Sequence, residues 1–112
     1  MFENKKILIL GMARSGYEAA KILLAKNNEV ILNDKDLEEN HDIDKINELK
    51  KLGCKLIFGD HPDNLLDESF DLLIKNPGIT PKHKYVEKAN ELGIPVINEV
   101  EMAYLMLPKD VT

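Results

Sequence analysis

The sequence predicts an α/β domain built around one parallel β-sheet, and two observations lead to this fold class. Short apolar runs alternate along the chain with segments in which apolar residues recur at helical spacing. Such alternation is typical of parallel strands joined by right-handed helical crossovers. A chain of 112 residues, 44% of them hydrophobic, is long enough for one domain with its own core. We therefore expect residues 1–112 to form a single doubly wound, Rossmann-like sheet of about five parallel strands with flanking helices.

The predicted strands share an apolar centre that is bounded by charged or turn-forming residues. They cover residues 6–10, 29–33, 54–58, 70–75 and 94–98. Runs of this length and composition are typical of strands that are buried on both faces of a parallel sheet. The fourth run ends at Asn76-Pro77-Gly78, a sequence that favours a turn.

The predicted helices cover residues 15–26, 42–52, 81–93 and 99–107. In the first of them, Ser15 is a candidate N-cap and Glu18 follows three residues later, which is the pattern of a capping box. The second helix is expected to end at Gly53 and to place four apolar residues on one face: Ile43, Ile46, Leu49 and Leu52. The third has Pro81 near its first turn and Gly93 at its end.

Charge and cysteine content exclude several classes of protein. The net charge of −5 argues against nucleic acid or an anionic membrane as a partner. No apolar stretch approaches the roughly 20 residues that cross a bilayer. The single cysteine, Cys54, fits a reducing cytoplasm, and its apolar surroundings predict a packed thiol. The basic cluster Lys82-His83-Lys84 is interpreted as a solvated helix start.

The first strand is followed by two glycines, Gly11 and Gly16, at the start of the first predicted helix. Gly11 permits a tight turn, Gly16 permits close packing of helix on strand, and the N–H groups of the helix start favour an anion. Ala13 stands where the dinucleotide-binding pattern has its middle glycine. The loop by itself is compatible with phosphate binding and equally with a plain strand–helix turn.

The second strand is followed by Asp34 and Lys35. Asp34 lies 18 residues beyond Gly16, about where an acidic residue meets a ribose hydroxyl in dinucleotide-binding domains. Its carboxylate could equally accept a hydrogen bond from the N–H of a pyrimidine, or cap a turn.

The third and fourth strands also end in turn-forming residues. Gly59-Asp60-His61-Pro62 follows the third strand, and His61 could reach a ligand from there, although a histidine in such a turn is more often solvated. The fourth is followed by Asn76-Pro77-Gly78, in which Pro77 offers a flat apolar face and Gly78 permits close approach of a ligand. The three histidines, His41, His61 and His83, are expected to lie far apart and show no ligand spacing, so no metal site is predicted.

Taken together, these segments resemble a known family. "LGMARSG", "ND", "GDHP", "KNPGI" and "PVINEVEMAYL" are similar to the N-terminal domain of the Mur ligases, and within them to the D-glutamate-adding branch of Gram-positive bacteria. The resemblance covers the whole chain. It implies part of an ATP-dependent ligase of peptidoglycan synthesis, in which ATP activates a substrate carboxylate and the amine of D-glutamate attacks the acyl phosphate.

The resemblance also implies which residues meet the substrate, UDP-N-acetylmuramoyl-L-alanine. The loop from Gly11 to Gly16 would face the diphosphate and ribose, with Arg14 and Ser15 at ligand-contacting positions. Asp34 would accept from the uracil N3–H with Lys35 beside it. The opposite wall would consist of Asn76, Pro77 and Gly78.

Other parts of the reaction are implied to lie outside this chain. D-glutamate, ATP and Mg²⁺ belong to further domains of the family, and no phosphate-loop motif occurs among these 112 residues. We expect no catalytic residue, metal or cofactor in this domain, and no activity of the domain alone. Two alternatives stay open: an NAD-binding domain of an oxidoreductase, and a non-catalytic ligand-sensing module.

Overall fold

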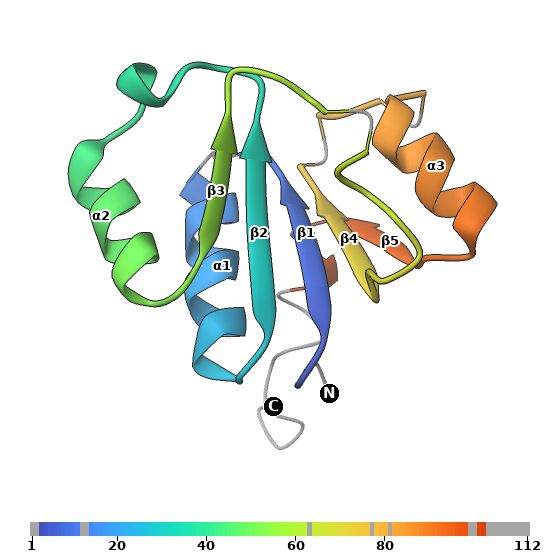
Figure 1. Ribbon diagram of the computed structural model, residues 1–112, viewed down its shortest axis with the longest axis horizontal. Coiled ribbons are helices and arrows are strands. Elements are labelled where there is room, and N and C mark those ends of the chain that lie inside the picture. The colour runs from blue at the N-terminus through green and yellow to red at the C-terminus, as the bar shows by residue number, and fades with distance from the viewer. Residues whose placement is uncertain are drawn as a thin grey trace.

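The computed structural model describes residues 3–11, 14–62, 64–76, 78–80, 82–98 and 101–102. Strands and helices alternate along these residues in the predicted order, with one short 3-10 helix, η1, that the sequence analysis did not predict (Figure 1). The elements are β1 (Lys6–Leu10), α1 (Arg14–Ala25), β2 (Glu29–Asp34), η1 (Glu38–Asn40), α2 (Ile43–Lys51), β3 (Lys55–Phe58), β4 (Leu72–Lys75), α3 (Lys84–Leu92) and β5 (Val96–Asn98).

The five strands form one parallel sheet in the order β3-β2-β1-β4-β5. The last residue of β1, Leu10, pairs with Asn33 of β2 on one side and with Lys75 of β4 on the other. The carboxyl ends of these three strands are therefore level with one another. The order reverses between β1 and β4, which is the switch point where ligands of doubly wound sheets bind. The predicted fold class is confirmed.

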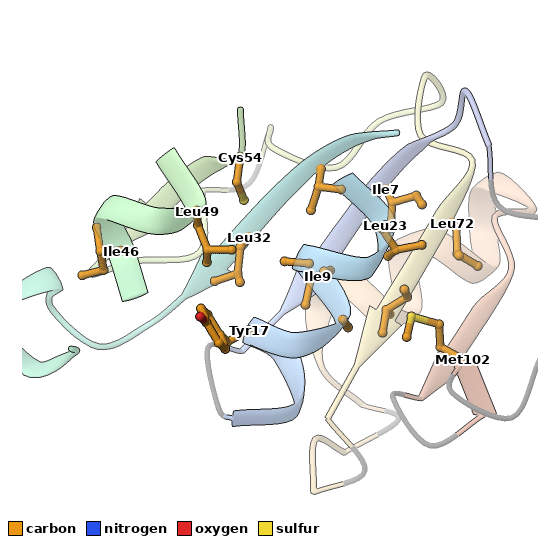
Figure 2. Packing of buried hydrophobic residues seen from close by; sticks show 14 residues of the cluster. Ile7, Ile9, Tyr17, Leu23, Leu32, Ile46, Leu49, Cys54, Leu72 and Met102 are labelled. Atoms are coloured by element: carbon orange, nitrogen blue, oxygen red, sulfur yellow. The ribbon is translucent and has the colours of Figure 1, made fainter. Parts of the chain in front are cut away.

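The sheet is buried on both faces by two apolar clusters. Side chains alternate along β1, so Ile7 and Ile9 belong to the cluster under α1 and α2, whereas Leu8 and Leu10 belong to the cluster under α3. In Figure 1, α1 and α2 accordingly lie together on one side and α3 lies apart from them. Figure 2 shows the first cluster filling the space between the sheet and the helices α1 and α2. This two-sided burial explains the continuous apolar runs.

The apolar face of α2 is only partly buried. Ile46 and Leu49 are fully buried, but Ile43 and Leu52, which were predicted on the same face, are 58% and 49% exposed. Ile43 is the first residue of the helix and Leu52 is its C-cap, so the exposed members of the face stand at the two ends of α2 and the buried ones lie between them. Asp42 caps the helix by accepting from the N–H groups of Asp44 and Lys45.

Two helices begin at positions other than those predicted. Helix α1 begins at Arg14, which puts Ser15 inside its first turn, so Ser15 is not the N-cap and the predicted capping box with Glu18 was wrong. Helix α3 begins at Lys84, three residues after Pro81, which lies outside the described residues. Of the predicted last helix, residues 101–102 are described and are helical.

Strand bounds differ from the prediction by at most two residues at each end.

Cys54 precedes β3 but is buried, and burial raises the pKa of its thiol to about 11. The prediction of a packed thiol is therefore confirmed. Within the described ranges, no helix is long and apolar enough to cross a membrane.

The N-terminus of α3 depends on a histidine cap. The ring Nδ1 of His83 accepts a hydrogen bond from the N–H of Tyr85 at 3.1 Å. Burial, together with the neighbouring His61 ring and the Lys84 ammonium, lowers the pKa of His83. The neutral imidazole that this favours is the form whose Nδ1 can accept. The predicted helix start at Lys82-His83-Lys84 is thus confirmed, although His83 is half-buried rather than fully solvated.

We expect the two leucines of α2 to differ sharply in their contribution to stability. Leu49→Ala should lower the free energy of unfolding by about 2–5 kcal/mol, because it leaves a cavity in the core. Leu52→Ala, the matched control on the same helix, should change it by less than about 0.5 kcal/mol. Urea denaturation followed by circular dichroism measures both values, and equal losses would contradict the burial pattern.

The His83 cap predicts a stability loss in mild acid. The pKa of His83 is lower in the folded state than its unfolded value of about 6.5, so the unfolded chain takes up the proton first as the pH falls. The free energy of unfolding should therefore decrease from pH 7 through about pH 6.5 and below. His83→Asn keeps a good N-cap but does not titrate, so its decrease should be smaller. Denaturation curves at pH 7.5 and pH 5 measure this decrease in wild type and in His83→Asn. If the free energy of unfolding falls by the same amount in both proteins, the His83 cap does not contribute to the loss.

Candidate functional site

The pocket of about 270 Å³ lies at the carboxyl ends of the central strands, where the strand order reverses. Residues from the ends of β1, β2 and β4 line it, together with residues from the β3–β4 connection and the start of α3. They are Leu10, Gly11, Asp34, Lys35, Asp36, His61, Asn76, Ile79 and His83. Of the predicted site residues, Gly11, Asp34, Lys35 and Asn76 are thus brought together in one pocket.

A fully buried amide, Asn33, ties the pocket walls together. Its Nδ2 donates to the carbonyl oxygens of Ile57 at 2.9 Å and Asp60 at 2.8 Å. Its Oδ1 lies 2.5 Å from Nδ1 of His61, and its backbone carbonyl accepts from the N–H of Gly11 at 2.7 Å. Sequence reasoning gave Asn33 no role. The available signal was a polar residue at the end of an otherwise apolar strand, since a buried amide requires partners.

His61 lies in the pocket wall rather than in a solvated turn. Its ring packs edge-on against that of His83, with the ring centroids 4.7 Å apart, so the expectation that the histidines lie far apart was wrong for this pair. Burial and the nearby Lys84 ammonium lower the pKa of His61, although the carboxylates of Asp34 and Asp60 oppose this. The pairing was not visible in the sequence because the two residues come from separate loops.

Contacts from α3 hold the loop that carries His61. The hydroxyl of Tyr85 donates to the carbonyl oxygen of Pro62 at 2.6 Å, and the Lys84 ammonium donates to the carbonyl oxygen of His61. Tyr85 is almost completely buried, so this contact fixes the loop against the core. The wall made by His61 and His83 is therefore one connected unit.

Asp34 is the last residue of β2 and points its carboxylate toward a turn. Its Oδ1 accepts from the N–H of Asp36 at 2.8 Å. Nε2 of His41 lies 3.8 Å from the same oxygen, and the His41 ring packs on Phe58. Asp34, Asp36 and His41 place one potential metal-ligating atom each within 4.8 Å of one another. Asp36 is exposed, and carboxylates gather in this way without an ion, so the cluster alone does not indicate a metal centre.

The loop after β1 requires glycine at its first position. Gly11 has a φ of +102°, a conformation that strains any residue with a Cβ. Its N–H is used by Asn33, so an anion would have to be bound by N–H groups further along, at the start of α1. The backbones of Arg14, Ser15 and Gly16 form the first turn of that helix, and Gly16 is buried. The predicted ligand contacts of these residues stay predictions.

The segment after β4 forms a turn that is held by hydrogen bonds between its own residues. Oδ1 of Asn76 accepts from the N–H of Gly78 at 2.9 Å, and the ammonium of Lys75 donates to the carbonyl oxygen of Ile79. Asn76 lines the pocket, whereas Gly78 is exposed at the turn and Pro77 lies outside the described residues. With Oδ1 occupied, the Nδ2 group of Asn76 is the part of the amide that can donate to a ligand.

A second, wider hollow runs along the exposed side of α2. It is lined by Asp44, Asn47, Glu48, Lys50 and Lys51. Its lining comes from a single helix, so it does not bring chemistry from separate elements together. The pocket at the strand ends is therefore the better candidate for a site.

Comparison with known proteins gives one consistent family. The family model of the Mur ligase MurD-like N-terminal domain matches residues 5–98. The UDP-N-acetylmuramoylalanine–D-glutamate ligase of Enterococcus hirae is 52% identical over 103 residues, which are 91% of this chain and 22% of that protein. The ligase of the same name from Geobacillus sp. (strain WCH70) is 44% identical over 92% of this chain and 22% of its own length. The chain thus spans about a fifth of these curated relatives.

Solved structures agree on the fold. The UDP-N-acetylmuramate-alanine ligase MurC of Thermotoga maritima superposes with a TM-score of 0.70 at 24% identity, over 88% of this chain and 22% of that one. Saccharopine dehydrogenase of Saccharomyces cerevisiae superposes with a TM-score of 0.58 at 22% identity, over 84% of this chain and 21% of that one. At these identities the likeness shows a shared sheet architecture only. Because the family model covers most of the chain, this protein belongs to the Mur ligase MurD-like N-terminal domain family.

Proposed function

We propose that this domain binds the uridine diphosphate part of UDP-N-acetylmuramoyl-L-alanine during the ATP-dependent addition of D-glutamate in peptidoglycan synthesis. The observation that carries the proposal is the pocket at the sheet's switch point, found in a chain of this family, with Asp34 and Asn76 on two of its walls. Asp34 accepts from the uracil N3–H, and Lys35 lies beside it.

The charge of the pocket supports one orientation of the ligand. Asp34 and Asp36 both line the pocket, and two carboxylates repel a diphosphate. The uncharged base and ribose therefore suit this end. The diphosphate suits the first turn of α1, where the N–H groups of Ser15 and Gly16 and the helix dipole favour an anion. Arg14, in the same turn, adds a positive charge, and Pro77 and Gly78, which follow Asn76 in the sequence, are proposed as further ligand contacts.

The chemical step belongs to other parts of the ligase. ATP, Mg²⁺ and D-glutamate are bound outside this domain, and these 112 residues contain no phosphate loop. Such an enzyme works in the cytoplasm, where its nucleotide-linked substrate is made. The pocket of about 270 Å³ is smaller than most sites for whole small ligands, which fits one wall of a cleft that other domains close. The domain alone should therefore bind UDP weakly and leave ATP intact.

We expect UDP to bind at the strand ends and NADH not to. In a ¹⁵N–¹H titration, UDP should shift amide signals within residues 11–16, at residues 34–35 and at Asn76 and Gly78, with a dissociation constant above about 1 µM. NADH at the same concentration serves as the control ligand. Stronger shifts of the same signals with NADH would replace this proposal by the oxidoreductase alternative.

The assignment of Asp34 to the uracil is tested by a change that preserves the turn. Asp34→Asn keeps an acceptor for the N–H of Asp36 but replaces the other oxygen by a donor, which cannot accept from N3–H. UDP affinity should fall by about 1.5–3 kcal/mol, or roughly tenfold or more, by calorimetry. Asp36→Asn removes the same charge from the same pocket and should have a much smaller effect. Equal losses in the two variants would mean that only the charge matters.

A further inference from the structure

The network around Asn33 fixes which nitrogen of His61 carries the hydrogen. Both hydrogens of the Asn33 amide are used by carbonyl oxygens, so its Oδ1 faces His61 as an acceptor. The nitrogen opposite it, Nδ1, must therefore donate. In a neutral ring the other nitrogen, Nε2, is then an acceptor. Among the described residues, no hydrogen bond reaches Nε2 of His61.

His83 has the opposite tautomer. Its Nδ1 accepts from the N–H of Tyr85, so the hydrogen of the neutral ring lies on Nε2. The pocket wall therefore contains two imidazoles of different character, with His61 as the acceptor and His83 as the donor. Both line the pocket, and the burial of His61 favours its neutral form.

The hydrogen-bond donors of UDP limit which group the acceptor of His61 can bind. This inference rests on the proposed function, in which the pocket binds UDP. The uridine part of UDP, whose 5′ oxygen carries the diphosphate, has three hydrogen-bond donors: N3–H of the base and the 2′ and 3′ hydroxyls of the ribose. Once Asp34 accepts from N3–H, a second acceptor in the same pocket can be met only by a hydroxyl. We propose that His61 is a ligand-binding residue whose Nε2 accepts a hydrogen bond from a ribose hydroxyl, with Asn33 holding the ring in the accepting tautomer.

The surroundings of His61 predict how pH acts on this contact. The ring packs against those of His83 and Tyr85, and the charges of Asp34, Lys35, Asp60 and Lys84 act on it. A proton taken up at Nε2 turns the acceptor into a donor, so the contact should be lost in acid and not in mild base.

Two amide variants separate the two nitrogens of His61. The amide of Asn reaches about as far as Nδ1 of His, so His61→Asn can keep the bond to Asn33 while removing the pocket acceptor. His61→Gln reaches about as far as Nε2 and can keep an acceptor in the pocket while losing the bond to Asn33. We expect UDP to bind His61→Asn about three- to tenfold more weakly than wild type, and His61→Gln to recover part of the loss.

Analogues of UDP that lack one ribose hydroxyl test the same contact on the wild-type protein. One of 2′-deoxy-UDP and 3′-deoxy-UDP should bind wild type about three- to tenfold more weakly than UDP, and this difference should vanish in His61→Asn. The imidazole ¹⁵N spectrum of the free protein should show His61 with hydrogen on Nδ1 and His83 with hydrogen on Nε2.

The outcomes distinguish this inference from the proposed function. Absence of UDP binding to wild type overturns both. UDP binding with equal affinity for the deoxy analogues, or with unchanged affinity in His61→Asn, overturns the role of His61 alone. If the deoxy analogue still binds His61→Asn more weakly than UDP does, but binds Asp34→Asn as well as UDP does, the ribose hydroxyl contacts Asp34. That result also overturns the role of His61. His61 with hydrogen on Nε2 contradicts the tautomer on which the inference depends.

Discussion

The buried amide of Asn33 is the interaction on which the site depends. A polar group without exposure must satisfy its hydrogen bonds inside the protein, and Asn33 does so with the end of β3, with the following loop and with His61. Its backbone carbonyl also fixes Gly11 at the end of β1. Three chain segments are thereby held at one point, so the pocket has fixed walls before any ligand arrives.

The parallel sheet explains why the pocket forms where it does. Level strand ends place the residues after β1, β2 and β4 within one small region, and the reversal of strand order leaves a gap between the loops. Carboxylates gather on the β2 side, and the first turn of α1 offers N–H groups. A ligand with an uncharged head and an anionic tail matches this division of charge.

The sequence predicted the order of strands and helices because buried parallel strands and amphipathic helices differ in apolar spacing. It placed Asp34 and Asn76 correctly at strand ends. It did not show what tertiary contacts decide: Ile43 matches the apolar spacing of α2 but is exposed at the start of the helix, and helix α1 begins before Ser15. The pairing of His61 with His83 depends on how two loops meet, which no local pattern encodes.

The alternation of side chains along β1 also affects how such a domain diverges. The two apolar clusters lie on the sheet faces, whereas the polar side chains that line the pocket follow the strand ends and belong to neither cluster. Polar residues of the pocket wall that lie outside the Asn33 network can therefore change while the sheet stays intact. Changes that alter ligand preference and changes that alter folding then fall on different positions, and a sheet of the same architecture is found in a solved structure that is 24% identical over the aligned residues.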